Sequence, residues 1–111
     1  MKTKTLYISD LDGTLLASDG HISDKSRDIL NKVMKDGAKV SIATSRNLFA
    51  FDQRVSGVDF SIPVILNTGG CIYNCQKKHY DVISDIPIDR VLQLKKILDE
   101  NKIASFIYGL V

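Results

Sequence analysis

Two aspartates separated by one residue, Asp10 and Asp12, offer the clearest chemistry in this sequence. They belong to the segment Asp-Leu-Asp-Gly-Thr-Leu, in which Gly13 lets the chain turn sharply and approach a ligand closely. Two carboxylates at this spacing can hold a hard cation such as Mg²⁺. The cation would neutralise charge on a phosphate, so that one carboxylate attacks phosphorus while the other exchanges protons with the leaving oxygen and with water.

The same residues have plainer interpretations. Asp and Gly are turn residues, and an isolated Asp-x-Asp-Gly is more often a solvated turn than a site. A calcium-binding EF-hand loop would need an acid at Thr14 and a glycine at Leu15, so that alternative fails. The position of Asp10 favours a site, because it directly follows an apolar run, and open α/β sheets bind ligands beyond the carboxyl ends of their strands.

The hydrophobic pattern predicts the elements that hold this pair. Residues 5–9 predict a buried parallel strand, followed by a loop to residue 22. Ser23 has the position of an N-cap, and Gly37 that of a left-handed residue after a helix. The next predicted elements are a helix at 24–36, a strand at 38–43, a helix at 47–55 and a strand at 63–66. This alternation predicts a parallel α/β sheet.

The pattern changes after residue 67. Two glycines, Gly69 and Gly70, interrupt the chain. The elements expected beyond them are a hairpin of segments 71–73 and 78–83, a linker at 85–87, a helix at 89–100 and a final strand at 103–108.

Three polar residues follow the second predicted strand: Thr44, Ser45 and Arg46. A hydroxyl at a strand end beside the first strand can donate a hydrogen bond to a phosphoryl oxygen. Thr44 can equally cap the helix that follows. For Arg46, contact with a phosphate and simple solvation in the first helical turn have equal support.

In this context, residues 10–15 resemble the first motif of the haloacid dehalogenase-like (HAD) phosphatases. The resemblance implies that Asp10 is the nucleophile, which forms an aspartyl-phosphate, and that Asp12 is the general acid and base. It also implies a Mg²⁺ ion held by the Asp10 carboxylate and the Asp12 backbone carbonyl. Thr44 matches the hydroxyl of the second motif, and Ser45 and Arg46 stand where the Cof-type branch often has Gly-Arg.

Residues 63–73 resemble the Cof-type stretch in which an Asn-Gly pair contributes to the substrate region. Aligned on Gly69, Thr68 takes the Asn position and Asn67 lies one residue early. A glycine turn into a hairpin explains these three residues as well. The Cof-type resemblance extends through residues 85–108, where an α/β cap would begin.

The expected fold is therefore a Rossmann-like parallel sheet, part of a HAD core, in residues 1–83, followed by the start of an α/β cap in residues 84–111. The basic third motif and the acidic fourth motif of the family are expected beyond the cap. The chain is therefore expected to be either an N-terminal portion of a longer enzyme or a self-associating remnant, and the activity of the 111 residues alone is left open. Without the strand of the fourth motif, residues 5–9 would form an exposed edge prone to self-association.

The expected function is Mg²⁺-dependent hydrolysis of a small phosphorylated metabolite, such as a sugar phosphate. The alternatives are a phosphomutase of related fold and a non-catalytic module that binds phosphate or protein. A phospho-accepting receiver domain is disfavoured, because its accepting Asp follows the third strand, where this chain has Asn67 and Thr68.

The composition and charge of the chain limit the classes of binding partner and the cellular location that we expect. Fifteen basic and 13 acidic residues give a net charge of +2, which argues against a nucleic-acid or polybasic membrane surface. There is no apolar run of about 18 residues and no signal-peptide pattern, so a cytoplasmic location is the default expectation. Cys71 and Cys75 are not accompanied by two histidines at the paired spacing of a zinc site, so we expect no zinc site there.

Overall fold

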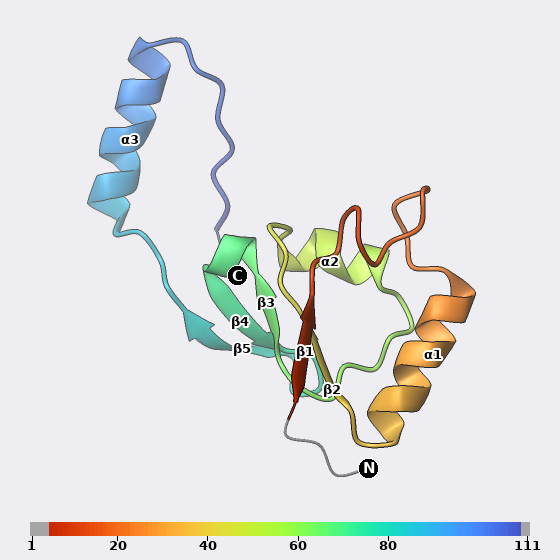
Figure 1. Ribbon diagram of the computed structural model, residues 1–111. Helices are drawn as coiled ribbons and strands as arrows, with labels where there is room; N and C mark the ends of the chain where they lie inside the picture. The colour runs from red at the N-terminus through yellow and green to blue at the C-terminus, as the bar shows by residue number, and fades with distance from the viewer. Residues whose placement is uncertain (1–4, 110–111) are drawn as a thin grey trace.

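The computed structural model describes residues 5–109 and has five strands in a mixed α/β arrangement (Figure 1). Strand β1 (Leu6–Ser9) pairs in parallel with β2 (Lys39–Ile42). A parallel bridge between Ala43 and Ile65 connects β2 to β3 (Val64–Leu66). The antiparallel strands β4 (Cys71–Asn74) and β5 (His79–Ile83) continue from β3. The predicted α/β class, the parallel start of the sheet and the hairpin are confirmed.

Helix α1 (Asp24–Lys35) has the two ends that the sequence predicts. The Ser23 side chain accepts a hydrogen bond from the Ser26 backbone N–H, which makes it the N-cap. At the other end Gly37 has a φ of 102°, and the N–H groups of Gly37 and Ala38 donate to the carbonyls of Met34 and Val33. This is a Schellman arrangement, in which a left-handed residue lets the chain leave the helix with its last carbonyls satisfied.

Helix α2 (Leu48–Arg54) is capped by Asn47, whose side chain accepts a hydrogen bond from the Ala50 N–H at 3.0 Å. The alternative prediction that Thr44 caps this helix is therefore wrong. Thr44 lies three residues too early, and its side-chain oxygen accepts from Arg46 instead.

Within residues 5–109, the buried apolar residues all come from the stretch between Leu11 and Tyr73. Leu11, Ile42, Val64 and Leu66 are fully inaccessible, and Phe51 of α2 packs its ring 5.7 Å from that of Phe60. Burying a side chain of this size contributes roughly 1.5–3 kcal/mol. Because Leu11 is anchored in this core while its neighbours Asp10 and Asp12 are exposed, hydrophobic packing holds the two carboxylates at the surface.

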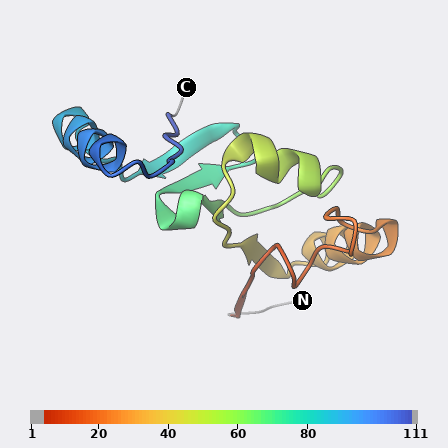
Figure 2. The ribbon, with the colours of Figure 1, turned by 90° about the horizontal axis from the view of Figure 1, so that it is seen from above.

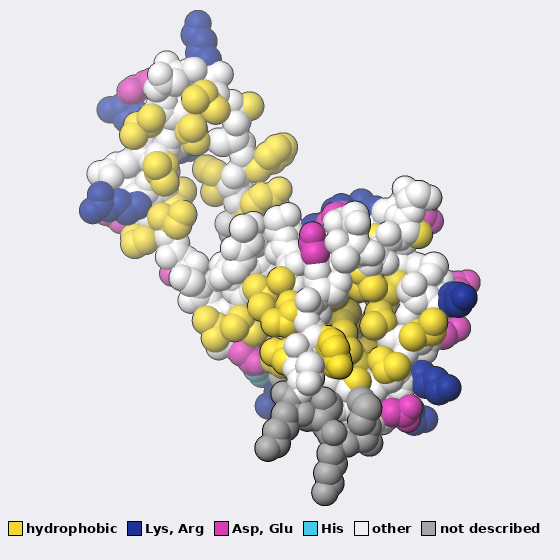
Figure 3. All heavy atoms as spheres, viewed as in Figure 1, with side chains coloured by type: hydrophobic (Ala, Val, Ile, Leu, Met, Phe, Trp, Pro, Cys, Tyr) yellow, Lys and Arg dark blue, Asp and Glu magenta, His cyan; other side chains and the backbone are white. Residues whose placement is uncertain are grey.

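Strand β1 lies where the sequence predicts it. The prediction of burial from its local pattern is wrong, and the expectation of an exposed edge is confirmed within the described residues. Leu6, Tyr7 and Ile8 are 54%, 56% and 50% exposed. Among the described residues β1 has a strand neighbour only on its β2 side, which makes it an edge. Figure 3 shows hydrophobic side chains gathered over this edge.

The part after β5 stands apart from the core (Figures 1 and 2). Helix α3 (Ile88–Glu100) begins one residue before the predicted position. The predicted strand at 103–108 is wrong: within the described range, residues 103–109 form no strand. A strand needs a neighbouring backbone for its hydrogen bonds, and this segment returns past α3 without pairing with one.

The apolar stretches do not suggest a membrane span. Within residues 5–109, each helix is too short or too polar to cross a bilayer.

Candidate active site

Asp10 follows β1 directly, at the carboxyl end of the parallel strand pair. The Ala43 N–H donates to the Ser9 carbonyl at 2.9 Å, which holds the ends of β1 and β2 side by side. The Asp10 side chain is exposed, and its Oδ1 accepts a hydrogen bond of 2.7 Å from the Leu11 N–H. Its other oxygen, Oδ2, accepts no hydrogen bond from any residue within 5–109. One carboxylate oxygen is thus oriented by the backbone and the other faces solvent.

The turn after Asp10 brings Asp12 back over the same strand ends. The N–H groups of Leu15 and Leu16 both donate to the Leu11 carbonyl at 3.1 Å. Gly13 has a φ of 74°, a conformation that side chains other than that of glycine rarely adopt, and a Cβ there would meet no atom within 4 Å. Glycine is therefore favoured here by backbone conformation rather than by crowding.

Arg46 binds the Asp12 carboxylate through both of its oxygens. Its Nε donates to Oδ2 at 2.8 Å and its Nη2 donates to Oδ1 at 2.6 Å. These hydrogen bonds, assisted by the positive charge, lower the pKa of Asp12 below the ordinary value, and Asp12 in turn raises the pKa of Arg46. Asp12 is thus held ionised in this arrangement.

Sequence reasoning missed this ion pair. It offered a phosphate contact or plain solvation for Arg46, whereas the side chain joins two loops that are 34 residues apart. The available signal was the position of this arginine. It lies four residues after the end of β2, and β2 ends beside β1, which is followed by the two acids.

Thr44 lies at the end of β2 and is 5% exposed. Its N–H donates to the Ile65 carbonyl at 3.0 Å, and its Oγ1 accepts from the Arg46 N–H at 3.2 Å. Because the second contact uses the oxygen as an acceptor, the hydroxyl hydrogen can still be donated to a ligand. Ser45, the next residue, is exposed.

The short turn η1 (Asn67–Gly69) contacts the same loop through its backbone. The Asn67 N–H donates to the Arg46 carbonyl at 3.0 Å, and the Thr68 N–H donates to the Thr44 carbonyl at 3.1 Å. The Asn67 side chain donates from Nδ2 to the Cys71 Sγ at 3.3 Å, and the Thr68 side chain is exposed. The structure therefore brings Asn67 and Thr68 to the site mainly through main-chain atoms.

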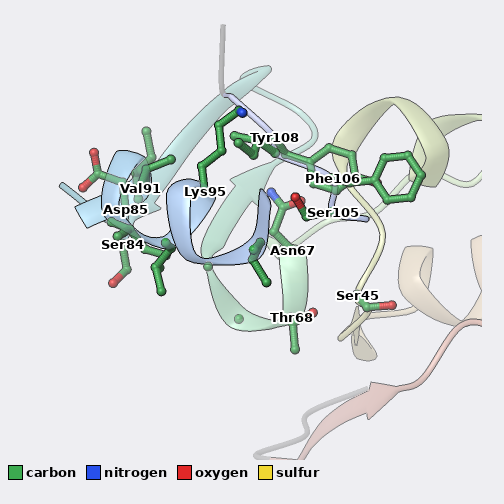
Figure 4. A pocket seen from close by; sticks show the side chains of 17 residues that line it. Ser45, Asn67, Thr68, Ser84, Asp85, Val91, Lys95, Ser105, Phe106 and Tyr108 are labelled. Carbon is green, nitrogen blue, oxygen red and sulfur yellow. The ribbon is translucent and has the colours of Figure 1, made fainter. Parts of the chain in front are cut away.

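Two open pockets adjoin this loop. One of about 460 Å³ is lined by Asp12, Ser45, Arg46, Asn47, Ala50 and Tyr108. A larger one, of about 680 Å³, lies between η1, the end of β5, α3 and residues 105–108, and Ser45 and Tyr108 line both. Figure 4 shows Val91 and Lys95 of α3 across this larger pocket from Ser45. Thr68 and Gly69 line the larger pocket as well, whereas Asp10 and Thr44 line neither.

The donor atoms at the site fit a magnesium ion. They are all oxygens, as a hard cation prefers, and Mg²⁺ commonly binds through one or two carboxylates together with phosphate and water. The family resemblance implies that the Asp10 carboxylate and the Asp12 backbone carbonyl would hold it. The Asp12 side chain is bound by Arg46 in this structure. Over residues 5–109 the structure groups no three His, Cys, Asp or Glu residues as a metal site.

Comparison with known proteins gives consistent matches. The haloacid dehalogenase-like hydrolase family matches residues 7–110. A 5-amino-6-(5-phospho-D-ribitylamino)uracil phosphatase, YitU of Bacillus subtilis, is 29% identical over 99 residues, which is 87% of this chain and 37% of that protein. The pyridoxal phosphate phosphatase YbhA of Escherichia coli is 27% identical over 97% of this chain and 39% of its own length.

Solved structures agree with these sequence matches. A haloacid dehalogenase-like hydrolase from B. subtilis superposes with a TM-score of 0.74 at 25% identity, over 87% of this chain and 34% of that chain. The phosphatase BT1666 from Bacteroides thetaiotaomicron has a TM-score of 0.70 at 26% identity, over 87% and 35%. The chain thus spans well under half of each of these proteins.

Proposed function

Because the chain belongs to the haloacid dehalogenase-like hydrolase family, we propose that its site supports phosphate monoester hydrolysis through an aspartyl-phosphate on Asp10. One observation carries the proposal: the Asp10 carboxylate is exposed at the carboxyl end of β1, beside the strand end that holds Thr44. A second carboxylate, Asp12, stands two residues away.

In the first step, an Asp10 carboxylate oxygen attacks phosphorus. A new O–P bond forms, and the ester P–O bond breaks with its electron pair going to the leaving oxygen. A leaving group of low pKa, such as 4-nitrophenolate, needs no proton. A leaving group of high pKa would take one from the protonated form of Asp12, which the Arg46 contact disfavours. The Thr44 hydroxyl would donate a hydrogen bond to a phosphoryl oxygen, which carries more charge in the transition state.

In the second step, water attacks phosphorus and gives a proton to Asp12. The acyl P–O bond then breaks, which releases inorganic phosphate and restores the Asp10 carboxylate. The Arg46 contact favours the ionised form of Asp12, which is the form that accepts this proton. A bound Mg²⁺, held by the Asp10 carboxylate and the Asp12 carbonyl, would neutralise charge on the phosphoryl group.

The proposed substrate is a small phosphorylated metabolite. The names of the two bacterial relatives, one acting on a ribitylaminouracil phosphate and one on pyridoxal phosphate, support this class. We also propose that residues 1–83 form part of the catalytic core and that residues 84–111 begin a cap. The larger pocket lies where these two parts meet, so its walls would select the leaving group.

Chemical trapping of the intermediate tests the proposal by identifying which aspartate carries the phosphoryl group. The chain is incubated with Mg²⁺ and an aryl phosphate, quenched in acid and treated with borohydride, which reduces an aspartyl-phosphate to homoserine. We expect homoserine at position 10, identified by mass spectrometry of the N-terminal peptides. The variant Asp12→Asn should increase its yield, because the second step loses its proton acceptor.

The matched control is Asp19→Asn, an acid of the same exposed loop outside the strand ends. It should leave the yield at position 10 unchanged. Homoserine at another acid, or none at position 10 while phosphate is released, would contradict the proposal. Analysis of a sugar phosphate product separates hydrolysis, which gives free phosphate, from a mutase reaction, which gives an isomer.

A further inference from the structure

We propose that Arg46 is a positioning residue, which holds the Asp12 carboxylate in one orientation for proton exchange. The inference rests on the proposed function, because it assigns a support to the acid and base of that reaction. It departs from the sequence prediction, in which Arg46 either binds phosphate directly or faces solvent.

The geometry of the ion pair is the first support. A guanidinium that donates to both oxygens of one carboxylate fixes the plane of that carboxylate as well as its distance. The two distances, 2.8 Å and 2.6 Å, are those of charge-assisted hydrogen bonds. The Asp12 side chain is 46% exposed, so without this contact few neighbours would restrict its rotation. Each oxygen has a second acceptor direction that the contact does not use.

The anchoring of Arg46 itself is the second support. Its N–H donates to the Thr44 side chain and its carbonyl accepts from the Asn67 N–H, so the backbone is fixed on both sides. Asn67 and Thr68 both have positive φ values, 52° and 55°, which are strained for residues with a Cβ. Their N–H groups donate hydrogen bonds to the carbonyls of Arg46 and Thr44, respectively. The strained turn therefore supports the loop that supports Asp12.

Two roles for Arg46 predict different kinetics. If Arg46 bound the substrate phosphate as a positive charge, its loss would raise KM, and lysine would restore much of the binding. If Arg46 positions Asp12, its loss lowers kcat and leaves KM nearly unchanged. Lysine would then fail to restore kcat, because an ammonium group cannot donate to both oxygens in one plane.

The test uses the whole chain with Arg46→Gln, Arg46→Lys and the control Arg27→Gln. Arg27 is also paired with carboxylates, those of Asp24 and Asp28, but on the surface of α1. NMR measures the three-bond Hα–Hβ couplings of Asp12, which show whether its side chain occupies one rotamer. We expect one rotamer in the wild type and in Arg27→Gln, and averaged couplings in both Arg46 variants.

The kinetic arm uses 4-nitrophenyl phosphate with Mg²⁺. We expect kcat to fall by about 10²-fold in Arg46→Gln and Arg46→Lys, as for misplaced catalytic groups, while KM changes by less than about threefold. Unchanged Asp12 couplings in both Arg46 variants would overturn the inference whatever the activity. A raised KM that lysine restores would overturn it too. Absence of turnover in the wild type would count against the proposed function, and the couplings would still decide the role of Arg46.

Discussion

The stretch from Leu11 to Tyr73 and the described residues 84–109 are packed very differently. The first contains every apolar side chain that is buried among the described residues, whereas none of residues 84–109 is buried. Helix α1 places Met34 in the core, while α3, of similar length, keeps its apolar residues Leu94 and Ile97 half exposed. The candidate catalytic carboxylates thus stand on the packed part, and one wall of the larger pocket stands on the unpacked part.

Under the proposed function, the two parts would have different tasks. Groups that do chemistry must be held within a fraction of an ångström, and the core beneath Leu11 provides that rigidity. A wall that selects a leaving group tolerates more variation, and few contacts hold residues 84–109 in place. Substitutions in the two parts should therefore have unequal effects.

The largest effect is expected for Leu11→Ala compared with Leu94→Ala. Leu11 is fully buried, so its truncation should lower the free energy of unfolding by about 2–5 kcal/mol. Leu94 is 50% exposed, and its truncation should change stability by less than about 0.5 kcal/mol. Urea titration followed by circular dichroism measures both. Equal losses of unfolding free energy in the two variants would show that α3 is packed as firmly as the core, which would contradict the difference between the two parts.

A smaller effect, about tenfold, is expected in the alkylation of Cys75. Burial raises the pKa of its thiol to about 11, with Asp52 adding to the shift. Near pH 8 the thiolate is therefore scarcer than in an exposed cysteine by about 100-fold, and its greater nucleophilicity offsets roughly tenfold of this. The rate with iodoacetamide should keep rising up to about pH 11.

The control for this measurement is a cysteine introduced on the unpacked part, Ser105→Cys. Residue 105 is exposed, so its rate should level off near the ordinary thiol pKa. Peptide mass spectrometry follows each cysteine separately. A Cys75 rate that levels off at the same pH as the introduced cysteine would show that the Cys75 thiol is not buried.

A gain of about 1 kcal/mol is expected for Thr68→Gly. Thr68 has a φ of 55°, and a left-handed conformation costs a residue with a Cβ roughly 1–2 kcal/mol, part of which glycine recovers. Lys102→Gly, at the same φ of 55° on the unpacked part, is the matched control and should leave the urea midpoint of the core unchanged. A loss of stability in Thr68→Gly would indicate that the threonine side chain makes a contact that outweighs the strain.

The smallest effect concerns the edge strand. We propose that copies of this chain associate weakly through β1, whose side chains Leu6, Tyr7 and Ile8 are about half exposed. Sedimentation velocity should show an average mass that rises with concentration, and Tyr7→Lys should reduce that rise. A monomer over the whole range in both proteins would remove this proposal.

Local sequence signals were sufficient for much of the fold. Ser23 and Gly37 delimit α1 through short-range hydrogen bonds and a backbone conformation, and both were predicted. Asp10 was placed at a strand end because the apolar run before it stops there. Features that depend on distant neighbours were not predictable in this way. The local pattern of β1 predicted burial, and its exposure followed only from the sheet order that the family resemblance implies. A strand at 103–108 would need a pairing partner.

The same distinction applies to the site. The types and spacing of Asp10 and Asp12 point to their chemistry, because both lie in one short segment. The contact between Asp12 and Arg46 depends on how two loops meet. The turn at Asn67 contributes through main-chain hydrogen bonds, which cannot be inferred from the type of its side chain.

The first measurement is phosphate release from 4-nitrophenyl phosphate by the wild-type chain and by Asp10→Asn, with and without Mg²⁺. We expect release by the wild type that depends on Mg²⁺ and is abolished in Asp10→Asn, whose amide is a poor nucleophile. Equal rates in the two proteins would contradict the assignment of Asp10 as the nucleophile of this chain.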